Sequence, residues 1–113
     1  MHEMSLCEDM VQLIGEQARL QGFRKVRTVR LEIGKLSCVE PEALRFAFEA
    51  VTRGTLCEGA RLEIDEADGA AWCAQCRQTV AVRQRFDTCP ECGHGPLEIK
   101  AGDAMRIGEL EVT

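Results

Sequence analysis

Four cysteines in two closely spaced pairs constrain this chain more than any other feature of its sequence. Two residues separate Cys73 from Cys76, two separate Cys89 from Cys92, and twelve lie between the pairs. This spacing is typical of zinc ribbons, in which a hairpin between the pairs brings four sulfurs to one point. Because four thiolates complete a tetrahedral shell, we expect one structural Zn²⁺ with no open position for a substrate.

Two other interpretations of the quartet stay open. Tetrahedral thiolates also hold iron, and a Cys-x2-Cys pair also suits a thiol redox enzyme that cycles Cys73 and Cys76 between dithiol and disulfide. Pro90 and Gly93 favour a metal site, because they shape a turn whose amides approach the thiolates. Residues 71–99 contain few apolar side chains, so we expect metal binding to supply about 10 kcal/mol or more of folding energy.

The charge balance argues against a ribbon that binds nucleic acid. The 113 residues include 14 Lys+Arg and 19 Asp+Glu, a net charge of -5, whereas binding to phosphates depends on basic side chains. We therefore expect Trp72 and Phe86 to be packing groups rather than platforms for bases. A zinc-ribbon module that binds nucleic acid or another protein is the alternative function.

Composition predicts a cytoplasmic protein that does not bind membranes. No stretch approaches the roughly 20 apolar residues of a membrane span, and no signal peptide is recognisable. Seven cysteines, an odd number, suit a reducing compartment. Cys7, Cys38 and Cys57 lack ligand spacing, so we interpret them as buried thiols.

Apolar periodicity predicts an α+β fold, with a small mixed sheet of about three strands packed with two helices, plus an inserted zinc-ribbon-like domain. The C-terminal strand returns to the sheet, with a β-bulge at Gly108. Residues 1–70 and 100–113 then form one discontinuous domain, and residues 71–99 form the zinc-binding domain. The expected elements are a helix with a Ser5/Glu8 capping box that ends at Gly22, a strand over 25–33, a helix from Pro41 to Gly54, and strands over 61–65 and 102–113.

The first residues, Met1, His2 and Glu3, suggest a second metal site. We expect the bulky His2 to prevent removal of Met1, which keeps the α-amine at a fixed distance from the imidazole. One amine, two backbone amides and one imidazole suit Ni²⁺ or Cu²⁺ in a square-planar or tetragonal array. Because ligation requires loss of protons, binding should weaken as pH falls. The alternative is that a histidine at a chain end has no function.

Several short motifs occur in order along the chain. They are MHE (1–3), LEIGKLS (31–37), PEAL (41–44), FAF (46–48), GARLE (59–63), the cysteine quartet and ELEV (109–112). Together they resemble the HypA/HybF family of hydrogenase maturation nickel metallochaperones.

The resemblance implies a nickel carrier and not an enzyme. It implies that His2 is the main ligand of a transiently bound Ni²⁺, aided by the nitrogens of Met1 and by Glu3, with Glu40 as a second acidic candidate. The discontinuous domain would carry this nickel. The implied partners are a HypB-type GTPase and the large subunit of a [NiFe] hydrogenase, and some family members also serve urease. We expect a monomer or homodimer, and we expect His94 to be a solvated loop residue.

Overall fold

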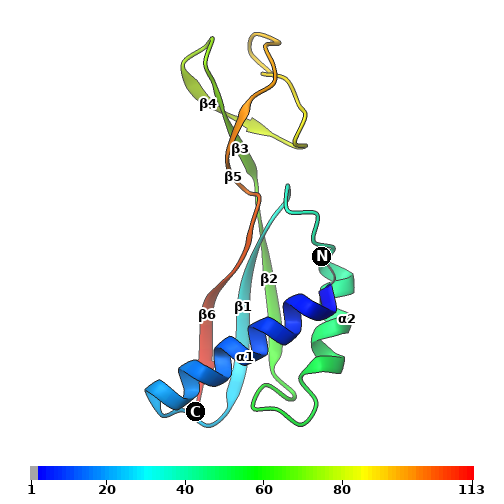
Figure 1. The fold of residues 1–113 in the computed structure, drawn as a ribbon, viewed down its shortest axis with the longest axis vertical. Helices are drawn as coiled ribbons and strands as arrows, with labels where there is room; N and C mark the ends of the chain where they lie inside the picture. Colours follow the sequence, from blue (N-terminus) through cyan, green and yellow to red (C-terminus); the bar gives the residue numbers. More distant parts are fainter. Residues whose placement is uncertain (1–2) are drawn as a thin grey trace. The chain divides into compact units, whose positions relative to one another are not determined.

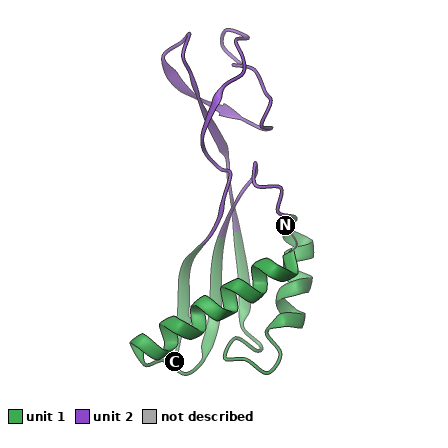
Figure 2. Ribbon diagram, in the orientation of Figure 1, with its two compact units in different colours: residues 1–31, 40–64, 107–113 green, residues 32–39, 65–106 purple. Residues whose placement is uncertain are grey.

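The computed structural model describes residues 3–113, which divide into two compact units (Figure 2). Within the described residues, the first unit comprises residues 3–31, 40–64 and 107–113, and the second comprises residues 32–39 and 65–106. The two helices and two three-stranded sheets of the described chain confirm the predicted α+β class. The division into domains at residues 70/71 and 99/100 stays a prediction.

Helix α1 spans Glu3–Gln21 and belongs to the first unit. Its buried residues Cys7, Met10 and Ile14 recur at intervals of three and four, which places them on one face. The predicted capping box is wrong, because the helix already includes Glu3 and so places Ser5 inside its first turns. The predicted stop is confirmed: Gly22 has a φ of 81°, and its amide donates to the carbonyl of Ala18 at 2.8 Å.

Helix α2 spans Pro41–Val51 and packs against α1. Glu40 is its N-cap, where the carboxylate accepts a hydrogen bond from the Glu42 amide at 3.3 Å. Pro41 occupies the first turn, as predicted. The buried stripe of this helix consists of Leu44, Ala47 and Phe48.

The first sheet has the strand order β2-β1-β6 (Figure 1). The predicted return of the C-terminal strand to this sheet is confirmed, and the structure places it beside the first strand. Its strands are β1 (Val26–Gly34), β2 (Arg61–Ala67) and β6 (Met105–Val112). The sheet is mixed. The amide of Thr113 donates to Lys25 at 2.9 Å, which joins the end of β6 to the start of β1, whereas the Lys35 amide donates to Ala67 at 2.9 Å, which joins the ends of β1 and β2.

The second sheet has the order β4-β3-β5, and both strand pairs are antiparallel. Its strands are β3 (Gly69–Cys73), β4 (Gln78–Val82) and β5 (Glu98–Ala101). The segment between the cysteine pairs contributes only one strand, β4, which pairs with the preceding strand β3. The predicted hairpin within that segment is therefore wrong. The first cysteine pair is itself the turn of the β3-β4 hairpin. The buried apolar side chains around this sheet are Leu36, Ala71, Val80 and Val82.

The prediction that Phe86 packs inside the ribbon is also wrong. Its side chain is 92% exposed, whereas Trp72 on β3 is partly buried. The loop that carries Phe86 is closed by polar contacts instead of apolar packing. The Asp87 carboxylate accepts hydrogen bonds from the amides of Arg83 at 2.9 Å and Gln84 at 3.1 Å.

Candidate metal centres

The first cysteine pair lies where β3 turns into β4. The amide of Arg77 donates to the Cys73 carbonyl at 2.8 Å, and the amide of Cys76 donates to the Cys73 sulfur at 3.4 Å. Arg77 closes the turn with a φ of 56°, a conformation that non-glycine residues adopt infrequently. The turn therefore aims both sulfurs to one side and supplies an amide to one of them.

The second pair lies in a similar turn after β4. The amide of Gly93 donates to the Cys89 carbonyl at 2.8 Å, and Gly93 has a φ of 75°, which confirms its predicted role. The amide of Cys89 donates to the His94 carbonyl at 2.8 Å. The His94 residue is exposed, as predicted for a solvated loop residue, and it supports the turn through its peptide group.

The two turns bring the four predicted zinc ligands together. The sulfurs of Cys73, Cys76, Cys89 and Cys92 all lie within 4.8 Å of one another. Cys73 and Cys92 are 3.6 Å apart, and Cys76 and Cys89 are 3.9 Å apart. Zinc–sulfur bonds of about 2.3 Å at tetrahedral angles require sulfurs about 3.8 Å apart, whereas a disulfide needs about 2.05 Å. The cluster therefore fits a structural zinc ion and contains no disulfide.

The electrostatics of the cluster also favour a bound dication. Burial raises the pKa of the Cys89 thiol, but hydrogen bonds from the backbone amides of Cys92 and Glu91, together with those from the Cys92 and Cys73 thiols, lower that pKa to about 7. Hydrogen bonding with Cys92 and, to a smaller extent, burial raise the pKa of the Cys76 thiol to about 12. Four thiols this close together therefore lose their last protons only when a cation such as Zn²⁺ binds the resulting thiolates.

The three remaining cysteines do not all behave as predicted. Cys7 and Cys57 are fully buried, which confirms the prediction, and burial raises both thiol pKa values, that of Cys7 to about 11 with help from the nearby Glu3 carboxylate. For Cys38 the prediction is wrong: this residue is exposed and has a φ of 65°. The Ser37 hydroxyl donates to the Gly34 carbonyl at 2.6 Å, and this tight turn after β1 leaves Cys38 in solvent.

Two of the four predicted nickel ligands can be placed. The amide of Glu40 donates to the Glu3 carboxylate at 3.4 Å, so the start of α1 meets the N-cap of α2. The sequence separates these residues by 37 positions and gives no direct sign of this contact. Met1 and His2 lie outside the described residues. The structure thus brings both acidic candidates to the place where the N-terminal tripeptide ends.

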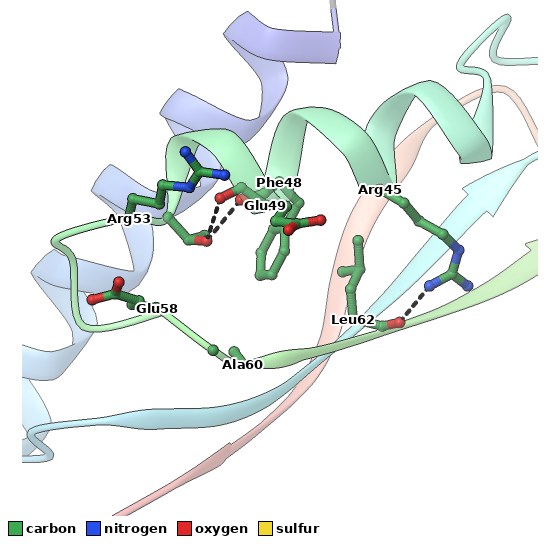
Figure 3. Close-up of a pocket in the computed structure, with 9 residues that line it drawn as sticks. Arg45, Phe48, Glu49, Arg53, Glu58, Ala60 and Leu62 are labelled. Atoms are coloured by element: carbon green, nitrogen blue, oxygen red, sulfur yellow. Dashed lines mark hydrogen bonds between the residues drawn. The ribbon is translucent and has the colours of Figure 1, made fainter.

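A separate hollow of about 460 Å³ lies between α2 and the start of β2 (Figure 3). Phe48 and Leu62 provide apolar lining, and Arg45 donates to the Leu62 carbonyl at 2.7 Å. Two arginines and two glutamates line the hollow, so their formal charges cancel. This arrangement anchors α2 on β2 and lacks the convergent charge of an ion site.

Comparison with known proteins bears on the whole chain. The sequence profile of the family described as "Hydrogenase/urease nickel incorporation, metallochaperone, hypA" matches residues 1–112. The chain belongs to the HypA family. This confirms the resemblance drawn from the motifs and identifies a nickel metallochaperone family of hydrogenase maturation.

Individual HypA proteins match over nearly their full length. Hydrogenase maturation factor HypA of Azotobacter chroococcum mcd 1 is 59% identical, and that of Azotobacter vinelandii is 57% identical, each over 112 residues that cover 99% of both chains. The solution structure of the Ni metallochaperone HypA from Helicobacter pylori superposes with a TM-score of 0.75 at 26% identity, covering 99% of this chain and 97% of that chain. No helix within residues 3–113 has the length and apolar character needed to cross a membrane.

Proposed function

We propose that this HypA family member binds Ni²⁺ at its N-terminus and delivers it during [NiFe] hydrogenase maturation. The match to the family profile from residue 1 supports the delivery role. The observation that carries the choice of site is the contact between the Glu3 carboxylate and the Glu40 amide. This contact places Glu40 beside Glu3, the last residue of the tripeptide whose sequence also supplies the amine of Met1 and the imidazole of His2.

The proposed ligands have distinct roles. The imidazole of His2 is the main donor, and the α-amine of Met1 and nearby backbone amides complete a nitrogen-rich set that suits Ni²⁺. Glu3 contributes a carboxylate near these donors. Glu40 has a secondary role, because its carboxylate also accepts the hydrogen bond from Glu42 that caps α2. A site made from a chain end can release its cargo without disturbing the core.

The zinc site has a structural task in this proposal. Cys73, Cys76, Cys89 and Cys92 hold one Zn²⁺, which stabilises the turns around it and offers no ligand position to a substrate. We assign no catalytic residue, and the chain acts as a carrier instead of an enzyme. Its cargo is bound and transferred without chemical conversion.

The partners follow from the delivery role. We propose that a HypB-type GTPase exchanges nickel with this chain and that the large subunit of a [NiFe] hydrogenase receives it. Urease is a second destination, in keeping with the family description. Delivery to these enzymes would take place in the cytoplasm, and we propose that the carrier is a monomer or a homodimer.

Nickel titration of untagged, zinc-loaded protein tests the proposed site. His2→Ala should weaken nickel binding by about 100-fold or more, because it removes the only imidazole of the ligand set, and metal sites lose about 10–100-fold even when supporting groups are removed. One residue added before Met1 should weaken binding as strongly, since it moves the terminal amine away from His2. Glu40→Gln should have a smaller effect, about tenfold or less.

Zinc content provides the control, and it should remain at one ion per chain in all three variants. His94→Ala is the matched control, because it removes the other histidine of the chain, and it should leave nickel affinity unchanged. Equal nickel affinity in the parent, His2→Ala and extended proteins would contradict an N-terminal site.

A further inference from the structure

A hollow of about 510 Å³ in the second unit differs from the metal centres in its charge. Its lining consists of Lys35, Asp68, the last two residues of β4 (Ala81 and Val82) and the next residue, Arg83. The hydrogen bond from Lys35 to Asp68, 2.7 Å long, raises the pKa of the lysine, and the nearby positive charge of Arg83 opposes this increase. Two cations therefore face one hollow that contains a single carboxylate.

Three acidic residues lie near this hollow, Asp68, Asp87 and Glu66, whose charge also raises the pKa of Lys35, but none of them forms an ion pair with Arg83. Asp68 forms an ion pair with Lys35, and the Asp87 carboxylate accepts hydrogen bonds from the backbone amides of Arg83 and Gln84. Among residues 3–113, no carboxylate forms an ion pair with the Arg83 guanidinium. Arg85, in the same loop, donates through Nε to the Leu36 carbonyl at 3.1 Å, which holds a third cation in this part of the unit. The Arg83 guanidinium thus has no ion-pair partner within residues 3–113, although the chain has a net charge of -5.

One edge of the second sheet borders the hollow. In the order β4-β3-β5, strand β4 pairs with β3 on one side only (Figure 1). A strand at the edge of a sheet presents unpaired amides and carbonyls that can pair with another extended chain. Its side chains alternate, with Val80 and Val82 buried and Thr79 and Ala81 exposed, so small side chains flank the free edge.

An exposed aromatic residue follows this edge. Phe86 lies four positions after the end of β4 and is 92% exposed. Hydrogen bonds of Asp87 and Arg85 close the loop that carries the ring. Single exposed apolar residues are common on proteins. Here the ring follows the end of an edge strand by four residues and Arg83 by three. An edge strand, an arginine without an ion pair and an exposed ring, so close in sequence, together suit a peptide ligand.

We propose that the β4 edge, Lys35, Arg83 and Phe86 form a docking surface for an extended acidic segment of a partner protein. The segment adds to the sheet as a strand beside β4. Its carboxylates pair with Arg83 and Lys35, and an apolar side chain covers Phe86. This surface is independent of the nickel site, so its test does not rest on nickel delivery.

A nucleic acid is the competing ligand, since arginines and an aromatic ring also bind single strands. The net charge of -5 opposes association with a polyanion over long range. A free strand edge also pairs with the amides and carbonyls of a peptide backbone. A phosphodiester backbone has no amides and cannot pair in this way. The observations therefore favour a peptide.

Fluorescence anisotropy of a defined probe tests the proposal on the full-length, zinc-loaded protein. The probe is a labelled peptide of four Glu-Val repeats, and its Lys-Val counterpart is the charge control. We expect saturable binding of the acidic peptide only, weakening as salt is added. Absence of saturable binding up to millimolar protein would overturn the proposal, as would tighter binding of labelled oligothymidine.

Charge-reversal variants locate the surface. Arg83→Glu and Lys35→Glu should each weaken binding by about tenfold or more. Arg27→Glu is the matched control, because it changes net charge equally at an exposed position on β1, and it should alter binding by less than about twofold. Phe86→Ala should weaken binding by about threefold to tenfold. Zinc content and the thermal unfolding midpoint confirm that each variant is folded. Equal effects of Arg83→Glu and Arg27→Glu would show nonspecific attraction and overturn the docking surface.

Backbone methylation of the probe tests strand addition separately from charge. Two acidic peptides are compared. One is N-methylated at its valines, and the other is N-methylated at its glutamates. Only one set of amides can face β4, so one peptide should lose binding by about tenfold or more and the other should retain it. Unchanged binding of both peptides would overturn pairing with the β4 edge.

Discussion

Replacing Cys89 with serine is expected to release zinc and unfold the β4-β3-β5 sheet. The Cys89 side chain is 1% exposed and belongs to the same buried cluster as Ala71 and Val80. That cluster contains only four buried apolar residues besides its cysteines, too few to offset the conformational entropy of the loops around them. Metal binding supplies about 10 kcal/mol or more in small zinc domains, so loss of one buried ligand should remove most of the stabilisation.

Zinc analysis and hydrogen exchange measure this result. Zinc should fall from one ion per chain to near zero, and the amides of β3, β4 and β5 should lose protection. Trp72, the only tryptophan, lies on β3 and should report the loss as a change in fluorescence. Cys38→Ser is the matched control, because this exposed cysteine lies outside the cluster and should leave zinc content unchanged. Full zinc retention by the Cys89→Ser protein would show that three cysteines suffice.

Replacing Gly34 with alanine is expected to destabilise the second unit by about 2–3 kcal/mol. A Cβ at this position would collide with the carbonyl of Gly102 and approach the amide of Asp103 to 2.8 Å. These obstacles are backbone atoms, which cannot rotate away as a flexible side chain can. The Leu36 amide also donates to the Gly102 carbonyl at 2.8 Å, so displacing that peptide group would break a further contact.

Urea unfolding of zinc-loaded protein tests this prediction. The midpoint followed by Trp72 fluorescence should fall by about 0.7–3 M, given slopes of about 1–3 kcal/mol/M for small proteins. Gly15→Ala adds the same methyl group inside α1, where, apart from the neighbouring backbone of the helix itself, no described atom lies within 4 Å of the new Cβ. It should leave stability unchanged or raise it by up to about 1 kcal/mol, because alanine is the better helix former. A Gly34→Ala midpoint equal to that of the parent protein would contradict the proposed close packing.

The sequence by itself determined the features whose information is local. The spacing of Cys73, Cys76, Cys89 and Cys92 was sufficient for the thiolate cluster, because each pair lies in one short turn. Helix α2 was recognisable from Pro41 and its apolar stripe, and β1 from its alternation. The return of β6 to the first sheet was also predictable, since a sheet of only two strands is marginally stable and the C-terminal residues alternate as a strand does. The order of short motifs identified the family.

Only the tertiary structure decided which distant residues meet. Glu3 and Glu40 come together because α1 packs on α2, and the hollow beside β4 combines Lys35 with Arg83 through the fold of the second unit. Exposure was also undecided by residue type: Phe86 and Cys38 are in solvent because polar contacts close their loops and turns. Periodicity describes one element at a time, whereas contacts between elements and the balance of packing against loop hydrogen bonds depend on the whole chain.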